Sequence, residues 1–406
     1  MSDQGLKRSL SLPLITLYGL GTTVGAGIYA LLGKVAAQAG LLAPFSFVLA
    51  AVLAGFTACS FAELSARIPK SAGEAIYVRE GFSAPRLAVV VGLLVALSGI
   101  VSAAAIANGA VGYFHEFIAV PREILIPLIV LILGALAAWG ISESVVMAGV
   151  FTVVEVLGLV VVVWAAHEYW GNFPDWAGQI GPSFSAGGAF GIVAGAYLAF
   201  YAFLGFEDMV NVAEEVKDVQ RNLPAAIFLT LGITTAIYFV VAVTAVLALP
   251  LDVLAASGAP LADIFEHGTG WSPAVISIIA IFAVMNGALI QIIMAARVLY
   301  GLGNERHLPG WFAHVHPRTR TPLISTALAT AVVIALALWF PITVLAEATS
   351  VIILVVFTLV NLALVMLKRR DPLPSGVRVY PVIIPVIGFL VSGAAIVTEI
   401  VRRLPF

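Results

Sequence analysis

Long apolar stretches separated by short polar segments dominate the hydrophobic pattern of this chain. A helix needs about 20 mostly apolar residues to cross about 30 Å of hydrocarbon. Stretches of this kind cover residues 13–38, 43–66, 86–112, 123–140, 145–167, 187–212, 223–249, 272–300, 322–340, 342–367 and 380–403. Little backbone remains between them for strands, and the ten-residue alternation of a membrane barrel is missing from the sequence. The pattern predicts an all-α membrane protein with about 11 transmembrane helices in a single transmembrane domain, residues 1–406.

Composition supports a membrane location and adds an orientation. The 406 residues are 61% hydrophobic and only 10% charged, which is more apolar surface than a soluble core of this length can bury. Lysine and arginine cluster in alternate loops. With the N-terminus in the cytoplasm, all 20 lie inside except Lys34, Arg122, Arg402 and Arg403. An N-terminus on the cytoplasmic side is therefore expected, with the C-terminal pair on the outer side.

Four connecting loops are longer than the others. Segments 67–85 and 301–321 are expected inside, and segments 168–186 and 250–271 outside. None is long enough to form a separate soluble domain. The single cysteine, Cys59, lies within the second apolar stretch, so no disulfide within the chain is expected.

Glycines gather at corresponding points of the first and sixth apolar stretches. The segment "GLGTTVGAGI" holds four glycines, and the sixth stretch holds four more before the abrupt "FLGFED". A glycine inside a helix costs about 1 kcal/mol relative to alanine. Interrupted helices at matching positions, five spans apart, are typical of inverted-repeat transporters that bind substrate at the breaks. We expect repeats at about 13–167 and 187–367, with an extra helix at about 380–403.

Three interpretations of the first glycine cluster differ in what they explain. A dinucleotide-binding glycine loop requires a preceding strand, which an apolar membrane span does not provide. A small-residue helix interface explains Gly21 and Gly25 but not Gly27. Unwinding of residues 25–27 would expose the first amides of an outer half-helix, where the positive end of the helix dipole attracts a carboxylate. The third interpretation is favoured.

Several carboxyl groups lie within the apolar stretches, and Glu207 and Glu155 are the most informative of them. Glu207 follows the second break and is expected either to bond the freed amides there or to contact a ligand. Glu155 is flanked by valines and leucines in "FTVVEVLGLV". It suits a proton relay, and the alternative is a neutral acid held by a backbone hydrogen bond. Glu63, one turn from Arg67, is interpreted as half of a structural ion pair.

The sequence offers little that indicates catalysis or cofactor binding. His307, His314 and His316 lie in a basic loop without cysteines or nearby carboxylates to complete a metal shell. The chain carries neither a Ser-His-Asp order nor an HExxH motif nor a phosphate loop. We expect no enzyme activity, no catalytic residues, no metal, no cofactor and no nucleic acid partner.

Five segments resemble the amino acid-polyamine-organocation transporter superfamily, in particular its bacterial amino acid permeases. They are "TTVGAGIYALLGKVAAQAG", "SFAELSARIPKSAGEAIYV", "YAFLGFEDMVNVAEEVKDVQRNLPAAI", "RVLYGLGNERHLPGWFAHVHPRTRTP" and "EATSVIILVVFTLVNLALV". The resemblance implies a core of five plus five inverted helices, interrupted at helices 1 and 6, in the cytoplasmic membrane of a bacterium. Two further helices usually follow that core, whereas one follows here.

The resemblance also implies a set of site residues. The substrate carboxylate would meet the amides of Gly25, Ala26 and Gly27, and its amino group would meet carbonyls near Thr23, Tyr201 and Leu204. Tyr201 would serve as an aromatic gate. The remaining candidates for the substrate pocket or gate are Ile28, Asn108, Phe203, Phe206 and Glu207. Glu155 occupies the position of a lysine in proton-coupled relatives, where sodium-coupled relatives hold their ion, so it is the candidate coupling residue.

Together these observations predict a secondary active transporter of amino acids that works by alternating access with proton-coupled uptake. Exchange of amino acids or amines and sodium coupling remain alternatives of the same class. A receptor or scaffold without transport and an intramembrane enzyme are alternatives of other classes. The expected partners are a small amino acid or amine, a proton or sodium ion, and the lipid bilayer. The identity of the substrate and the oligomeric state stay open.

Overall fold

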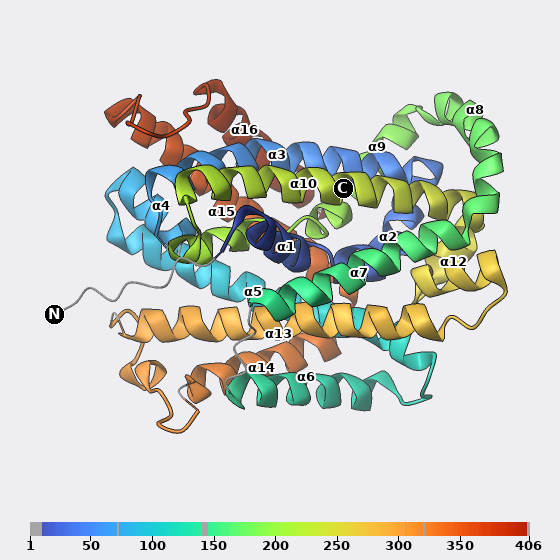
Figure 1. Cartoon of the computed structure of the whole chain (residues 1–406), viewed down its shortest axis with the longest axis horizontal. Helices are drawn as coiled ribbons and strands as arrows, with labels where there is room; N and C mark the ends of the chain where they lie inside the picture. The colour runs from blue at the N-terminus through green and yellow to red at the C-terminus, as the bar shows by residue number, and fades with distance from the viewer. Residues whose placement is uncertain (1–9, 71–72, 140–144, 305, 320, 404–406) are drawn as a thin grey trace.

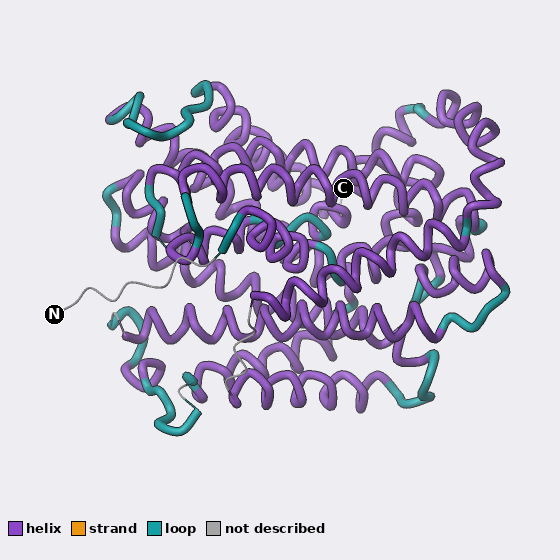
Figure 2. Tube along the Cα trace, viewed as in Figure 1, coloured by secondary structure: helices purple, strands orange, loops and turns teal. Residues whose placement is uncertain are grey.

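The structure is a computed structural model of the whole chain, and it describes all residues except 1–9, 71–72, 140–144, 305, 320 and 404–406. The described residues form α-helices and short 3-10 helices without named strands (Figures 1 and 2). The helices are α1 (Leu12–Thr23), α2 (Ala26–Ala39), η1 (Gly40–Leu42), α3 (Ala43–Arg67), α4 (Gly73–Phe82), α5 (Pro85–His115), α6 (Arg122–Trp139), α7 (Val145–Ala165), η2 (His167–Asn172), α8 (Phe173–Ser183), α9 (Ala186–Tyr201), η3 (Glu207–Glu215), α10 (Val219–Ala248), α11 (Leu251–Ala256), α12 (Pro260–Thr269), α13 (Ala274–Asn304), η4 (Gly310–Ala313), α14 (Leu323–Trp339), α15 (Ile342–Arg370) and α16 (Ile383–Arg403).

The predicted apolar stretches correspond to these helices within a few residues at most ends. In the described part of the chain, 7 helices are long and apolar enough to cross a membrane, and 8 if the bent pair Gly149–Ala165 and His167–Ser183 forms one span. Helices α9 and α14 are shorter apolar helices of 16 and 17 residues. The prediction of an all-α membrane protein is confirmed, and the chain is a multi-pass membrane protein.

The long helices run side by side along one direction, with the short broken helices near the middle of the molecule (Figure 1). Helix α13 packs on α5, α10 packs on α3, and α15 packs on both α5 and α16. Within this frame α1 contacts α7 and α10, while α2 contacts α9. The ends of the two broken helices are thereby brought to the centre of the fold.

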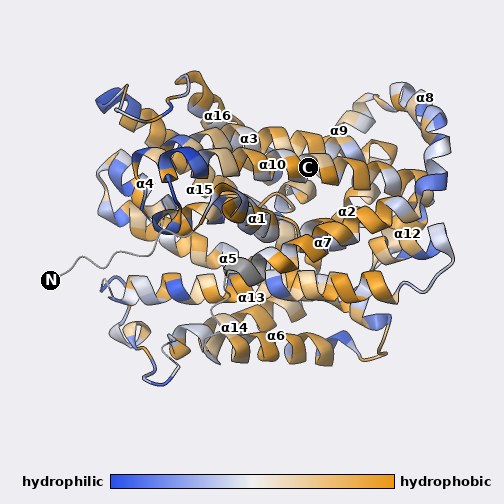
Figure 3. Cartoon of the chain, viewed as in Figure 1, coloured by the Kyte–Doolittle hydropathy of each residue, from blue (hydrophilic) through white to orange (hydrophobic). Residues whose placement is uncertain are grey.

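The four long connecting segments contain short helices that the apolar pattern alone did not indicate. Helix α4 lies in segment 67–85, η4 in 301–321, η2 and α8 in 168–186, and α11 and α12 in 250–271. Apolar residues fill the middle of the long helices, and hydrophilic residues gather at their two ends, most densely around α4 (Figure 3). The N-terminal residues used to predict the orientation lie outside the described residues.

A buried ion cluster joins three parts of the chain near α4. Glu63 Oε1 lies 2.7 Å from Arg67 and 2.7 Å from Lys368 of α15. Glu63 Oε2 accepts a hydrogen bond of 2.9 Å from the Tyr380 amide, and Lys368 donates to the Tyr380 carbonyl. The expected pair of Glu63 with Arg67 is confirmed, and Lys368 is a second cation that the sequence did not indicate.

Candidate functional site

The first break lies between α1 and α2. Helix α1 ends at Thr23, Val24 and Gly25 are not helical, and α2 begins at Ala26. The prediction that residues 25–27 are unwound is therefore wrong for Ala26 and Gly27, which already form the first turn of α2. The break lies one residue earlier, at Val24 and Gly25. The Gly25 carbonyl supports this turn, since it accepts 3.2 Å hydrogen bonds from the amides of Ile28 and Tyr29.

The amides at the start of α2 are candidate donors to a ligand. The first N–H groups of any helix have no carbonyl partner within that helix. Among the described residues, the N–H groups of Gly25 and Gly27 donate no hydrogen bond to a backbone group outside α2. The positive end of α2 therefore presents donors to the gap between the half-helices, as the carboxylate hypothesis requires.

The second break follows α9. Helix α9 ends at Tyr201, and η3 begins at Glu207 after a turn. Gly205 has φ +124°, in the region that favours glycine, and a Cβ there would lie 2.3 Å from the Thr22 carbonyl oxygen. Thr22 Oγ1 donates a 2.9 Å hydrogen bond to the Gly205 carbonyl, and the Gly205 amide donates 2.8 Å to Glu207 Oε2. Of the two interpretations of Glu207, its position matches the one in which it bonds a freed amide.

A tyrosine from α10 connects the two breaks. The Tyr238 hydroxyl lies 2.9 Å from the Thr23 carbonyl oxygen and 3.0 Å from that of Ala202. Its ring packs edge-on against Phe203, with ring centroids 5.2 Å apart. Reasoning from the sequence missed Tyr238. The available signal was a tyrosine inside an apolar helix, because a buried hydroxyl usually has a polar partner.

The two glycines of the first break have different surroundings. A Cβ added at Gly27 would lie 2.3 Å from Ala202 Cα, whereas a Cβ at Gly25 would meet nothing within 4 Å. Gly27 therefore allows α2 to approach the end of α9 closely. Gly25 borders open space, where a ligand can approach the backbone. Helix packing is therefore a second constraint on Gly27, which also lines the cavity between the breaks.

A small cavity of about 40 Å³ lies between the breaks. Five predicted site residues line it, namely Thr23, Gly25, Gly27, Tyr201 and Leu204. The other lining residues are Gly21, Thr22, Ser102, Ile106, Gly287, Ile290 and Gln291. Those from α5 and α13 were missed, because apolar helices buried on several sides carry no pattern that marks one face.

The remaining candidates, apart from Ala26, lie outside the cavity lining. Ile28, Phe203 and Phe206 are fully buried in the packing around the breaks. The Asn108 amide donates to the carbonyls of Ala337 and Phe340, at 2.8 and 3.1 Å, and so connects α5 to the end of α14. Ala26 contributes the first residue of α2 through its backbone, and its side chain lies outside the described part of the structure.

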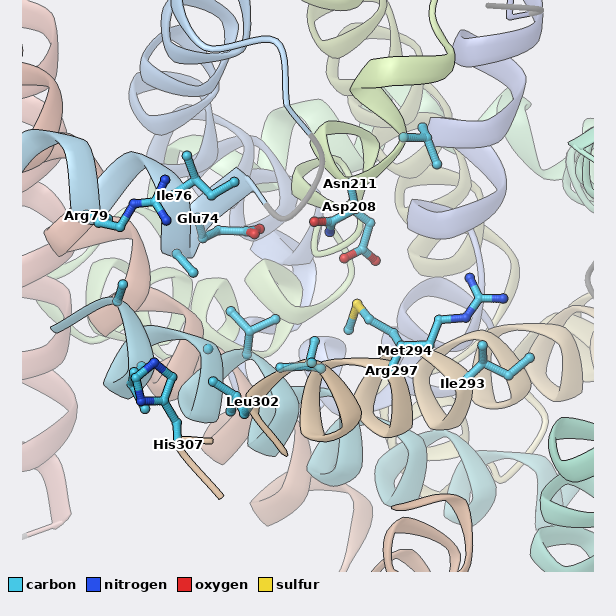
Figure 4. A pocket seen from close by; sticks show the side chains of 18 of the residues that line it. Glu74, Ile76, Arg79, Asp208, Asn211, Ile293, Met294, Arg297, Leu302 and His307 are labelled. Atoms are coloured by element: carbon cyan, nitrogen blue, oxygen red, sulfur yellow. The ribbon is translucent and has the colours of Figure 1, made fainter. Parts of the chain in front are cut away.

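A larger cavity of about 820 Å³, which we call the vestibule, opens at the α4 end of the molecule. It lies between α4, α5, η3 and α13, and Ile290 lines both the vestibule and the small cavity. Figure 4 shows the Glu74 carboxyl group pointing toward Asp208 across the vestibule, with Arg297 extending from α13. Burial raises the pKa of Glu74 to about 8, and the Asp208 charge adds to the rise.

Tight packing covers the opposite side of α2. A Cβ at Gly33 would lie 2.2 Å from the Leu254 carbonyl oxygen of α11, and Lys34 Nζ donates 2.9 Å to the Ala255 carbonyl. Tyr113 of α5 donates to the Tyr29 carbonyl at 2.5 Å. The small cavity therefore adjoins the vestibule on one side and closely packed helices on the other.

Glu155 lies in α7 beside both halves of the first broken helix. Thr152, one turn earlier, donates a 3.2 Å hydrogen bond to the Leu17 carbonyl of α1. The Tyr29 hydroxyl of α2 donates 2.8 Å to the Glu155 backbone carbonyl. Glu155 is only 2% exposed. It therefore lies at the level of the break, close to but not lining the small cavity.

The chain resembles known transporters over most of its length. The sequence pattern of the amino acid permease family matches residues 10–403. The chain is 28% identical over 398 residues to the vacuolar cationic amino acid transporter 2 of Arabidopsis thaliana, covering 92% of this chain and 62% of that protein. It is 26% identical to a branched-chain amino acid permease of Bacillus subtilis, over 91% and 83% of the two chains, and 33% identical to an uncharacterized transporter of Mycobacterium tuberculosis, over 82% and 74%. It thus spans less than two thirds of the plant relative but most of the bacterial ones, and it belongs to the amino acid permease family.

Proposed function

We propose that the chain is a secondary transporter of amino acids that works by alternating access. The observation that supports this most is a cavity bounded by two helix breaks, which adjoins a vestibule at one end and packed helices at the other. Discontinuous helices with donors and carbonyls at the breaks are the usual way in which transporters bind a zwitterion near the membrane midplane. Rocking of one helix bundle would close the vestibule and open the opposite side.

The substrate carboxylate would bind the amides of Gly25, Ala26 and Gly27, and its amino group would bind carbonyls near Thr23, Tyr201 and Leu204. The Thr23 carbonyl already accepts from Tyr238, so it offers the substrate only its second lone pair. In this arrangement the five-plus-five repeats contribute one break each, with α16 outside the repeats. The vestibule faces the cytoplasm of a bacterium, with the N-terminus on the same side.

We assign coupling to Glu155, with a proton as the coupling ion. The residue is buried, lies at the level of the break and contacts both half-helices through its own turn of α7. A carboxyl group there can exchange a proton when the site changes its access to water. Sodium bound by the same carboxylate is the rival form of coupling.

Uptake into proteoliposomes tests the proposal. The purified chain is reconstituted, and uptake of a panel of labelled amino acids is measured under an inward proton gradient, an inward sodium gradient or neither. Saturable uptake that accumulates under the proton gradient is expected, and Glu155→Gln is expected to remove this accumulation. Lack of uptake across the whole panel would overturn the proposal. Accumulation driven by sodium alone, or an unchanged pH dependence in Glu155→Gln, would overturn only the proton coupling.

A further inference from the structure

The side chains that line the small cavity are uncharged. Ser102 and Ile106 come from α5, and Gly287, Ile290 and Gln291 come from α13. No Asp, Glu, Lys, Arg or His is found among the described lining residues of this cavity, whereas the vestibule is lined by both signs of charge. A cationic side chain in the small cavity would thus lose its hydration without a counter-charge, which is strongly unfavourable.

Two polar side chains give this wall its hydrogen-bonding character. The Ser102 and Tyr201 hydroxyl oxygens lie 2.9 Å apart, and the Tyr201 hydroxyl also donates to the Ser102 carbonyl at 3.2 Å. Ser102 therefore donates to Tyr201 and keeps lone pairs for another donor. Among the described residues, the Gln291 side chain makes no hydrogen bond that would occupy its two N–H donors, and it lines the same cavity.

The space at this wall is limited. The cavity measures about 40 Å³, and Gly287 supplies part of it because it has no side chain. A Cβ at Gly287 would lie 3.6 Å from Ile106 Cδ1, which is ordinary contact, so alanine fits there but removes space. The same cavity would also hold the carboxylate and amino groups of the proposed substrate, so a side chain of one to three non-hydrogen atoms suits it better than a long or aromatic one.

We propose that Ser102, Gln291 and Gly287 form a side-chain subsite that selects small uncharged amino acids, with hydroxyl-bearing ones favoured. This inference rests on the proposed transport function and specifies its substrate class. The substrate hydroxyl would donate to Ser102 Oγ and accept from the Gln291 amide. A substrate would pass the charged residues of the vestibule before it reaches this subsite, and these residues would not contact its bound side chain.

Direct uptake of labelled L-serine, L-alanine, L-leucine and L-arginine tests the selectivity in wild-type proteoliposomes. Serine and alanine are expected to be taken up. A hydrogen bond to the hydroxyl favours serine by a factor on the order of 10. Arginine is expected to be taken up less efficiently than serine by a factor of more than about 100. Uptake of arginine or leucine as efficient as that of serine would overturn the subsite and leave the transport function standing. Absence of all uptake would instead overturn the transport function.

Variants test the residues. Ser102→Ala and Gln291→Ala are expected to bring the serine to alanine preference close to 1, and Gly287→Ala is expected to reduce serine uptake more than glycine uptake. Ser98→Ala is the matched control, because Ser98 lies one turn away on α5 and donates to the Val95 carbonyl at 2.8 Å. The preference is a ratio within one preparation, so it does not depend on how much variant folds. A wild-type ratio in both Ser102→Ala and Gln291→Ala would overturn the assignment.

Discussion

The contrast between Gly25 and Gly27 leads to a paired prediction about stability. In Gly27→Ala the new methyl would lie 2.3 Å from Ala202 Cα and 2.4 Å from its Cβ. Favourable carbon contacts require about 3.5 to 4.0 Å, so α2 and the end of α9 must separate by about 1 Å. Overpacking of this kind costs about 1 to 3 kcal/mol.

Gly27→Ala should therefore lose about 1 to 3 kcal/mol of unfolding free energy, measured as a lower midpoint of thermal unfolding in detergent. Gly25→Ala is the control, because its Cβ meets no atom within 4 Å and its backbone is extended, with φ −175°. Its stability should stay within about 0.5 kcal/mol of wild type, while its substrate affinity falls because the methyl enters the cavity. Equal stability of Gly27→Ala and wild type, or a destabilised Gly25→Ala, would refute this account of the two glycines.

Three further predictions concern groups around the site. Tyr238→Phe leaves the carbonyls of both breaks without their shared donor and should lower stability by about 1 to 3 kcal/mol in the same melt, whereas an unchanged midpoint would show that the bridge is dispensable. Glu63→Gln leaves two buried cations facing each other and should cost about 3 to 5 kcal/mol, seen as faster thermal inactivation; a loss below about 1 kcal/mol would contradict a structural cluster. Burial raises the pKa of Glu74, so this residue keeps its proton up to about pH 8 in the folded chain. The unfolded chain releases that proton near about pH 4.3, so wild-type stability should fall as pH rises between these values. Thermal melts of Glu74→Gln across this range should lack that part of the fall, and identical pH profiles would exclude it.

Much of the fold could be predicted because the bilayer restricts the choices. A membrane helix must be long, apolar and internally hydrogen-bonded, so the apolar stretches mark α3, α5, α10, α13 and α15 closely. The breaks were also visible, since glycines concentrate where helices part. The exact residues of the first break were not, because glycine is tolerated both in a turn and at a close helix contact, and only the neighbouring Ala202 distinguishes the two.

The site could be predicted on the broken helices but not on their neighbours. Gly25 follows from the glycine cluster, whereas Thr23, Tyr201 and Leu204 follow from the resemblance to known permeases. All four line the cavity. Gln291 could not be found in the same way, because it lies in a long apolar helix that packs against other helices on several sides. Asn108 is the opposite case, because it was expected in the substrate pocket or gate and lies outside the cavity lining. A polar residue in a membrane helix needs a partner, and for Asn108 the partners are carbonyls at a helix end rather than a ligand.

In the proposed mechanism the first turn of α2 binds the carboxylate of an amino acid. Competition against uptake of a labelled amino acid tests this directly, with the unlabelled amino acid compared with its own carboxamide, which has nearly the same shape but no negative charge. Hydrogen bonds to a charged group contribute about 1.5 to 3 kcal/mol, so the carboxamide should compete at least about 10-fold more weakly. Equal competition by the two compounds would contradict the account.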